Sequence, residues 1–351
     1  MLIDNIKSII ENTLKIYPCK IEIRYNEPMK DHTTFKTGGP ADCLLQPVSK
    51  NYKADNCDNF PLFCCELLNR AKTEGAPVFI LGGGANIVVS DKGIRGIVLD
   101  MSAYKDQVLN ETPDTRLFFD EDIIIFKSGT KIDDAVNIAA ENNLSGLEFL
   151  AGMPGTIGGA VWMNARCYGS EIADIFYRAE IITNEECGVG NEKCRIRNEE
   201  CTEKRYTIKK IEIKNGEGFS YKKSRFQKMD CLILNAAFKL NKCDKEKIFI
   251  DINKYRQDRK EKGQYLFPSA GSVFKNNHTF GKPAGQIIDE CGLKGLKKGG
   301  AQIAPFHCNI IINADNAAAS DIRALTDEVA LKVKAAAGFQ LEPEILFIGE
   351  W

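Results

Sequence analysis

The amino-acid sequence predicts an α+β protein built from more than one domain. Its 351 residues are enough for two or three packed domains. Short apolar runs beside glycine turns predict strands, and longer amphipathic segments predict helices. The composition changes near Glu217, at the end of a highly charged stretch, and we expect a domain boundary there.

The N-terminal elements follow from these patterns. An amphipathic helix is expected up to about Leu14, because charges interrupt its apolar positions too often for a signal peptide. Residues 20–48 alternate between β-like runs and turns, and a polar loop is expected at about 50–60. A helix is expected over 61–75, where a glycine ends it, and another over 131–142. Further strands are predicted at 77–81, 87–89, 96–99 and 123–126.

The C-terminal elements form a separate pattern. Residues 185–210 are highly charged without a clear period, and we interpret them as an excursion on the surface. Strands are predicted at 231–238, 271–274, 309–313 and 344–348, with a basic helix in the C-terminal third and a long helix at 320–337. The predicted division is an N-terminal helix (1–20), a first domain (21–217, in subdomains of about 21–100 and 101–217) and a last domain (218–351).

Charge and cysteine usage exclude several classes of protein. The 47 basic and 48 acidic residues nearly cancel, so no overall field attracts nucleic acid or membrane. No stretch approaches the ~20 apolar residues of a membrane span. Thirteen cysteines, an odd number without a secretory signal, favour reduced thiols in the cytoplasm. Cys187, Cys194 and Cys201 lack the close pairing of a zinc site, so we interpret them as part of a solvated insertion and predict no metal.

Two glycine-rich segments are candidate ligand sites. The first lies between two predicted strands and consists of Gly82, Gly83, Gly84, Ala85 and Asn86. Consecutive glycines adopt positive φ readily and bring backbone N–H groups close to an anion, which suits a pyrophosphate. A tight hairpin is the alternative. No helix follows directly, so this is not the dinucleotide fingerprint G-x-G-x-x-G.

The second segment concentrates glycine more strongly. A chain with so few side chains can lie against a large flat ligand, and the alternative is a buried helix packed closely through glycine. Each glycine costs a helix up to about 1 kcal/mol relative to alanine, so their repeated use favours the ligand. Two such segments suit a dinucleotide cofactor, one at its phosphates and one along its isoalloxazine. The residues concerned are Gly152, Pro154, Gly155, Thr156, Gly158, Gly159 and Ala160.

Candidate catalytic groups occur in the last domain. Ser272 stands between a glycine turn and an apolar strand, without the G-x-S-x-G elbow or the His/Asp pair of a nucleophile. It either caps a strand or donates a proton to a developing carbanion. Glu344 opens the last strand and points either to solvent or into a cleft. Lys294, with two further lysines near His307, predicts either a diphosphate site or a solvated basic face.

Together these segments resemble the UDP-N-acetylenolpyruvoylglucosamine reductase family of flavoenzymes. The matching motifs follow the family's order over nearly the whole chain. They are NEP (26–28), HTTFKTGGPA (32–41), LGGGAN (81–86), GMPGTIGGA (152–160), MNA (163–165), YG (168–169), AGSVFK (270–275), GGAQ (299–302) and LEPE (341–344).

The resemblance implies both a fold and a reaction. The fold is a two-subdomain FAD-binding fold of the vanillyl-alcohol oxidase type, followed by an α+β substrate-binding domain. NADPH reduces non-covalent FAD, which passes hydride to UDP-N-acetylglucosamine enolpyruvate in peptidoglycan synthesis. The family's proton-donating serine corresponds to Ser272 and its catalytic glutamate to Glu344. By proximity to the motifs, the substrate contacts implied are Tyr221, Lys275, Asn276, Lys294, Gln302, His307 and Asn309.

One position departs from the family pattern. The family motif Tyr-Arg-x-Ser reads Tyr221-Lys222-Lys223-Ser224 here, and Lys222 keeps the charge but loses the bidentate fork of arginine. Arg225 is an alternative source of that fork. The tyrosine-bearing loop of one family branch has no counterpart between residues 230 and 258, which indicates the shorter-loop branch. Two other functions stay open, namely an FAD-dependent oxidase of a small alcohol or sugar and a non-catalytic relative that only binds.

Overall fold

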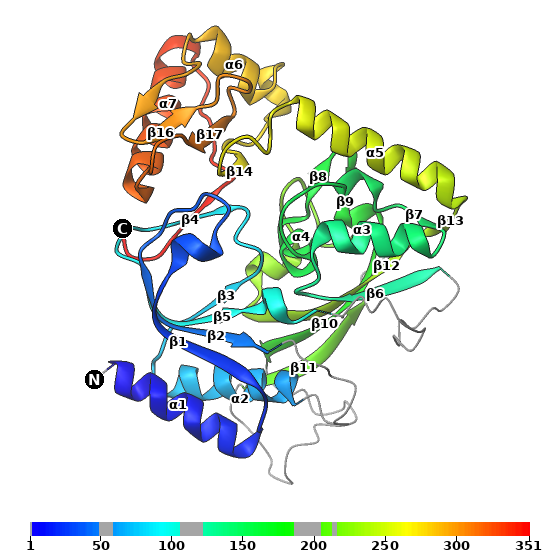
Figure 1. Ribbon diagram of the computed structural model, residues 1–351, viewed down its shortest axis with the longest axis vertical. Helices are drawn as coiled ribbons and strands as arrows, with labels where there is room; N and C mark the ends of the chain where they lie inside the picture. Colours follow the sequence, from blue (N-terminus) through cyan, green and yellow to red (C-terminus); the bar gives the residue numbers. More distant parts are fainter. Residues whose placement is uncertain (1, 49–58, 106–121, 186–204, 213–215) are drawn as a thin grey trace. The chain divides into compact units, whose positions relative to one another are not determined.

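The chain folds into two compact units. The computed structural model describes residues 2–48, 59–105, 122–185, 205–212 and 216–351 (Figure 1). Unit 1 consists of residues 1–23, 45–82 and 96–252, and unit 2 of residues 24–44, 83–95 and 253–351. The chain passes from one unit to the other within strands β1 (Ile21–Pro28), β2 (Pro40–Pro47) and β5 (Ile94–Asp100), within helix α5 (Lys245–Glu261), and between Gly82 and Gly83.

Unit 1 is organised around a four-stranded sheet in the order β11-β10-β12-β6, antiparallel throughout. The strands are β6 (Ile123–Lys127), β10 (Phe176–Glu185), β11 (Arg205–Glu212) and β12 (Cys231–Lys239). Helix α2 (Phe60–Thr73) contacts β10 and β11 and packs on α1 (Leu2–Ile16), while α4 (Ile157–Met163) contacts β12 and β6. Figure 1 shows α3 (Ile132–Glu141) and α4 above this sheet and α2 below it. Phe126, Phe226 and Phe238 are fully buried in its core.

A second sheet has the order β1-β2-β5-β3, in which β3 (Val78–Leu81) runs parallel to β5. Short strand pairs complete unit 1. They are β8 (Arg166–Cys167) with β9 (Ser170–Glu171), and β7 (Leu144–Ser145) with β13 (Asn241–Lys242).

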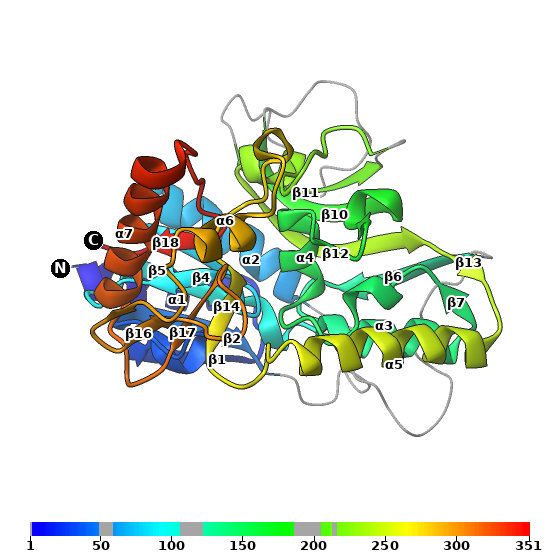
Figure 2. The same ribbon diagram turned by 90° about the horizontal axis from the view of Figure 1, so that it is seen from above.

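Unit 2 combines the C-terminal residues with two earlier segments. Its sheet has the order β14-β17-β16-β15, formed by β14 (Ser269–Ser272), β15 (Lys297–Lys298), β16 (Ala301–Ile303) and β17 (Ile310–Asn313). Its helices are α6 (Ala284–Glu290) and α7 (Ala319–Ala337). The final strand β18 (Leu346–Ile348) pairs in parallel with β4 (Ile87–Val89), and Figure 2 labels both. Phe35 and Val88 belong to the same buried cluster as Ile311.

Polar contacts reinforce this assembly of distant segments. The carboxylate of Asp91 accepts hydrogen bonds from the backbone N–H groups of Ala319 (2.8 Å) and Ser320 (2.9 Å), and so caps the start of α7. Burial alone would raise the pKa of the Asp91 carboxyl, but these hydrogen bonds outweigh it and lower that pKa. The side-chain amide of Asn313 also donates to the carbonyl of Phe35 (3.0 Å).

Most predicted elements are confirmed, and one interpretation is wrong in part. The charged sequence predicts a surface excursion that includes residues 205–210, but residues 205–212 form β11, which pairs with β10. As an edge strand, β11 buries only Tyr206 and exposes Arg205, Ile208, Lys210 and Glu212, so its apolar period is weak. The cysteine-bearing stretch 186–204 and residues 50–58 of the predicted polar loop lie outside the described residues.

The predicted boundary at residue 217 lies inside unit 1. That unit continues to residue 252 because β12 is a central strand of its larger sheet, between β10 and β6. The functional division into an FAD-binding part and a substrate-binding part stays a prediction. None of the described helices has the length and apolar character needed to cross a membrane.

Candidate active site

The structure brings Gly82, the first residue of the first glycine segment, beside the second segment in unit 1. A Cβ atom placed on Gly82 would lie 2.8 Å from the Oγ1 of Thr156 and 3.9 Å from the Cα of Gly159. Gly82 directly follows β3, and Thr156 precedes the first residue of α4 in extended conformation. We call Gly82, Thr156 and Gly159 the glycine cradle.

Three buried hydroxyl groups accompany the glycine cradle. Within the described part of the chain, the side-chain oxygens of Ser128, Thr130 and Thr156 have no hydrogen-bond partner. Ser128 and Thr130 follow β6, and their carbonyls accept hydrogen bonds from the N–H groups of Gly158 (2.8 Å) and Ile157 (2.9 Å) at the start of α4. A buried hydroxyl without a partner costs about 1–3 kcal/mol, so three of them indicate a ligand with several polar atoms.

The glycines of the second segment have different structural reasons. A Cβ on Gly158 would lie 2.8 Å from the Cβ of Ser128, so close packing explains this glycine. A Cβ on Gly159 would make only an ordinary contact, 3.6 Å from the Oγ1 of Thr156, so packing does not explain it. Close packing therefore holds at Gly158, whereas contact between Gly159 and a flat ligand stays a prediction. Gly152 and Gly155 adopt positive φ (+72° and +122°), Pro154 is exposed and Ala160 is buried.

The remainder of the first segment belongs to unit 2. Gly84 has a φ of +59°, and a Cβ there would lie 2.0 Å from the carbonyl oxygen of His32. The N–H of Thr34 donates to the carbonyl of Gly84 (3.0 Å), and the side chain of Asn86 donates to the carbonyl of Glu344 (3.1 Å). These contacts explain Gly84 and Asn86 structurally. For Gly83, Gly84, Ala85 and Asn86, contact with FAD stays a prediction.

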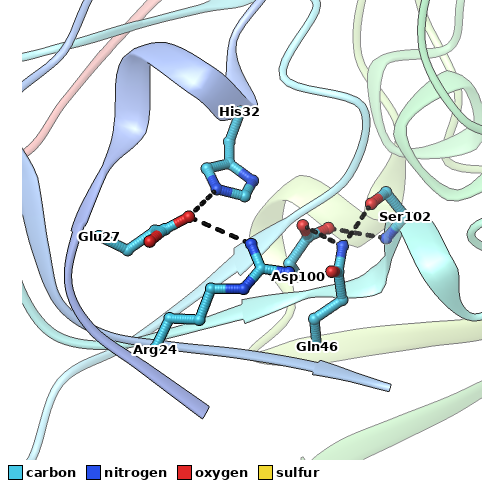
Figure 3. A network of polar contacts seen from close by, with 6 residues as sticks. All are labelled: Arg24, Glu27, His32, Gln46, Asp100 and Ser102. Atoms are coloured by element: carbon cyan, nitrogen blue, oxygen red, sulfur yellow. Dashed lines mark hydrogen bonds and ion pairs between the residues drawn. The ribbon is translucent and has the colours of Figure 1, made fainter. Parts of the chain in front are cut away.

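A charged network holds the segment that contacts Gly84. The carboxylate of Glu27 pairs with His32 Nε2 (2.9 Å) and with the guanidinium of Arg24 (3.1 Å), as Figure 3 shows. Burial alone would raise the pKa of Glu27, but the hydrogen bonds from His32 and Arg24 lower it. Figure 3 also shows a separate contact in unit 1, where the side chain of Gln46 donates to the carboxylate of Asp100 (2.8 Å).

Ser272 and Glu344 lie on neighbouring backbone segments of unit 2. Ser272 is exposed and ends β14, where it pairs with Ile310 after a bulge at Gly271, whose φ is +72°. The N–H of Glu344 donates to the carbonyl of Val273 (2.7 Å), the residue after Ser272. Glu344 is 9% exposed, so its carboxyl is not the solvated group that the sequence left as an alternative.

The predicted substrate residues of unit 2 differ in their surroundings. Asn309 is buried, and its side-chain amide accepts from the N–H of Phe274 (2.9 Å) and donates to its carbonyl (2.8 Å), which fixes the strand beyond Ser272. Lys275 pairs with Glu342, and the Asn276 side chain accepts from the N–H of Ala284 (2.9 Å). Each residue's contact with substrate stays a prediction.

The remaining three predicted contacts surround the same sheet. Lys294 is exposed, and the Gln302 side chain donates to the carbonyl of Gly295 (3.2 Å). The Nδ1 of His307 accepts from the N–H of Asn309 (3.2 Å). Burial lowers the pKa of the His307 imidazole below its ordinary value, and the charge of Lys262 lowers it further.

Tyr221 and Lys222 form the corner of a tight turn in unit 1. The backbones of Ser220 and Lys223 exchange two hydrogen bonds of 2.9 Å, and Lys222 adopts a φ of +56°. The Asn164 side chain at the end of α4 donates to the carbonyl of Ser220 (2.9 Å), and the Ser224 hydroxyl donates to the carbonyl of Trp162 (2.7 Å). The turn is therefore fastened to the C-terminal end of α4. Arg225 packs its side-chain carbons beside Gly218.

Several residues of this candidate site were not predicted from the sequence. Ser128 and Thr130 carry two of the three unpartnered hydroxyls, and the signal available was a Ser-Gly-Thr directly after a predicted strand. The Glu27–His32 pair lay within two noted motifs, but their spacing alone did not indicate that the side chains meet.

Comparison with known proteins agrees with this geometry. Residues 64–186 match the model of an FAD binding domain, and residues 261–348 match that of the UDP-N-acetylenolpyruvoylglucosamine reductase C-terminal domain. The chain is 36% identical to the UDP-N-acetylenolpyruvoylglucosamine reductase of Treponema denticola over 360 residues, covering 99% of both chains. It is 39% identical to that of Borreliella burgdorferi over 332 residues, covering 94% and 96%.

A solved structure extends the likeness to the fold. The crystal structure of UDP-N-acetylenolpyruvylglucosamine reductase from Thermus caldophilus matches with a TM-score of 0.66 and 29% identity, over 94% of this chain and 99% of that one. The predicted α+β fold, an FAD-binding fold of the vanillyl-alcohol oxidase type with a C-terminal α+β domain, is confirmed. On these observations, the chain belongs to the UDP-N-acetylenolpyruvoylglucosamine reductase family.

Proposed function

We propose that this protein reduces UDP-N-acetylglucosamine enolpyruvate to UDP-N-acetylmuramate for peptidoglycan synthesis, with FAD as cofactor and NADPH as co-substrate. The observation that carries the proposal is the glycine cradle with its three buried hydroxyls, inside the region that matches an FAD binding domain. The cradle offers a surface without side chains for a flat ring, and the hydroxyls offer hydrogen bonds to its polar edge or to phosphate oxygens. The residues present therefore fit FAD.

The protein's own residues supply the remaining chemistry. FAD held at the glycine cradle would supply the hydride chemistry, with NADPH as the source of hydride and the enolpyruvyl methylene carbon as its acceptor. Ser272 then gives its hydroxyl proton to the carbon beside the carboxylate, so that one hydride and one proton add across the double bond. Lys222 holds the substrate carboxylate and stabilises the negative charge that develops there. Glu344 takes the role of the family's catalytic glutamate, on the backbone segment adjacent to Ser272.

Rapid mixing under anaerobic conditions tests the proposal. Protein reduced with one equivalent of NADPH is mixed with UDP-N-acetylglucosamine enolpyruvate, and flavin absorbance is followed. We expect the absorbance of oxidised flavin to return in the time of one turnover. Return only after oxygen is admitted would indicate an oxidase, and tight binding of the sugar without any return would indicate a non-catalytic relative. Either result would overturn the proposal.

The role of Ser272 has a matched control in the same strand. Ser272→Ala removes the proton donor, and we expect flavin reoxidation by the enolpyruvyl sugar to slow by about 10²–10⁴-fold. Reduction by NADPH should stay unchanged. Ser269→Ala, at the other end of β14, should leave both rates unchanged. Equal rates for the two variants would exclude Ser272 as the donor.

We also propose that the protein acts in the cytoplasm. Each of the nine cysteines that the structure describes is a free thiol, including the adjacent buried pair Cys64 and Cys65. Reduced thiols are typical of the cytoplasm. Cell fractionation with an antibody to the protein tests this, and recovery in a compartment outside the cytoplasm would contradict it.

A further inference from the structure

Arg166 lies beside the turn that carries Lys222. It is the first residue of β8 and follows Asn164, the C-cap of α4, by two residues. The central carbon of its guanidinium lies 5.5 Å from the ring centroid of Tyr221, within the range of a cation–π contact. Tyr221 directly precedes Lys222, so the guanidinium of Arg166 lies beside the turn that carries Lys222.

The backbone segments that carry Arg166 and Lys222 are both fixed to the C-terminal end of α4. The side chain of Asn164 donates to the carbonyl of Ser220, and that of Gln227 donates to the carbonyls of Lys222 (3.2 Å) and Trp162 (2.9 Å). Arg166 follows Asn164 by two residues, and its own backbone is fixed in the β8–β9 pair. The seven residues of α4 span about 10 Å, with the glycine cradle at the first turn of the helix and Arg166 three residues beyond its last residue.

The guanidinium of Arg166 keeps donors for a ligand. Its ion pair with Glu171 has an N···O distance of 3.6 Å, which is longer than a hydrogen bond. The side chain is 36% exposed, so a ligand reaches it without displacing the fold. Stacking on an aromatic face leaves the N–H edges of a guanidinium in position to bind a carboxylate with two parallel hydrogen bonds.

We propose that Arg166 binds the substrate carboxylate and supplies the bidentate fork that Lys222 lacks. The inference rests on the proposed function, since it assigns a further substrate-binding residue to that site. Lys222 provides a point charge and Arg166 the planar pair of donors. Together they would bind the substrate carboxylate as the single arginine of the family motif does. Arg225, whose side-chain carbons pack at Gly218, is not needed for this role.

Ligand binding to the FAD-loaded protein separates this role from a structural one. The probes are UDP-N-acetylmuramate, which has the carboxylate, and UDP-N-acetylglucosamine, which lacks it, each titrated by calorimetry. In Arg166→Gln we expect the Kd of the first to rise at least about tenfold, the loss of a charge-assisted bidentate contact, and the Kd of the second to stay unchanged. Arg166→Lys, which keeps the charge without the fork, should lie between Gln and wild type.

A matched arginine serves as control. The guanidinium of Arg178 lies 5.8 Å from the ring centroid of Tyr177, also in unit 1 and also half-buried. Arg178→Gln should leave both affinities unchanged. Adding Lys222→Arg to Arg166→Gln should recover most of the lost affinity, because it restores a fork on the same turn.

The outcomes test the role of Arg166 separately from the proposed function of the protein. Unchanged binding of UDP-N-acetylmuramate to Arg166→Gln, or equal weakening of both ligands, overturns the role of Arg166. A wild-type protein that does not couple NADPH oxidation to the enolpyruvyl sugar overturns the proposed function instead. Wild-type turnover with unchanged carboxylate binding in Arg166→Gln removes only the inference made here.

Discussion

Two sets of buried hydroxyl groups in this protein differ in their hydrogen-bond partners. Thr13 and Thr326 are fully buried, and each donates to a carbonyl in its own helix, at 2.7 Å to Ile9 and 2.8 Å to Ile322. Ser128, Thr130 and Thr156 are as deeply buried, but within the described residues their oxygens have no partner. The first set stabilises helices, and the second set lowers stability unless a ligand satisfies it.

Replacing Thr156 with valine tests the second set. Valine has nearly the same shape, so Thr156→Val should weaken FAD binding by about tenfold, which corresponds to one hydrogen bond of about 1.4 kcal/mol. The melting temperature of the apoprotein should stay the same or rise, because the hydroxyl has no protein partner to lose. FAD affinity is measured by fluorescence titration and stability by thermal unfolding.

Thr13→Val is the control for this prediction. It removes a satisfied hydroxyl from α1, so it should lower the melting temperature and leave the FAD affinity unchanged. The assignment of Thr156 to FAD would be wrong if its variant behaved as Thr13→Val does.

At the scale of the element, two adjacent glycines of helix α4 are expected to have different roles. Gly158 is required for packing and Gly159 for FAD binding. In Gly158→Ala, the new methyl group would lie 2.8 Å from the Cβ of Ser128 and 3.2 Å from its carbonyl oxygen, so we expect a loss of about 1–3 kcal/mol in stability. In Gly159→Ala the methyl has room, and alanine favours the helix by up to about 1 kcal/mol. The second variant should therefore be as stable as wild type but bind FAD at least about tenfold more weakly, since ~1.4 kcal/mol of lost contact gives that factor.

Thermal unfolding of the two apoproteins, together with FAD titration, decides between these effects. Gly159→Ala with full FAD affinity would show that the cradle does not face the cofactor. Gly158→Ala with wild-type stability would show that α4 moves away from Ser128 without cost.

Helix α7 gives an element-scale prediction about pH. The pKa of the Asp91 carboxyl is lowered from its ordinary 3.8 in the folded state, so its contribution is complete above that value and is lost as the pH falls through the lower folded pKa. Asp91→Ala should cost about 1 kcal/mol at pH 7, as for other N-caps, and less near pH 3. Urea unfolding at both pH values measures this, and a difference that does not depend on pH would contradict the charged cap.

The sequence predicted the elements whose signal is local and missed those that depend on partners. The amphipathic period of α1 and the terminal glycine of α2 identified both helices within a few residues. Edge strand β11 was not predicted, because residues 186–204 separate it in sequence from its partner β10. A short sequence window does not cover that distance. The glycine segments were predicted as ligand sites from backbone freedom and from the cost of glycine in a helix, whereas Ser128 and Thr130 become informative only once their lack of partners is known.

At the scale of the whole molecule, the C-terminal domain matched by its family model is not a separable piece. Unit 2 needs Phe35 and Val88 in its buried cluster, β4 as the neighbour of β18, and Asp91 as the cap of α7. We expect a shortened protein of residues 253–351 to lack a cooperative unfolding transition, followed by circular dichroism in urea. The full-length protein is the control, and a sigmoidal transition in the fragment would contradict the assignment of residues 24–44 and 83–95 to unit 2.

The passage of the chain between units has a consequence during synthesis. Residues 24–95 leave the ribosome early, but unit 2 closes only when residues 253–351 have followed. At about 5–20 residues per second, the 256 residues from 95 to 351 take roughly 13–51 s to translate. For that time Phe35 and Val88 have no permanent neighbours from the C-terminal segment, so the nascent chain presents apolar surface to chaperones and to other nascent chains. Slowing translation directly after residue 95 should therefore lower the yield of folded protein more than slowing it close to the stop codon.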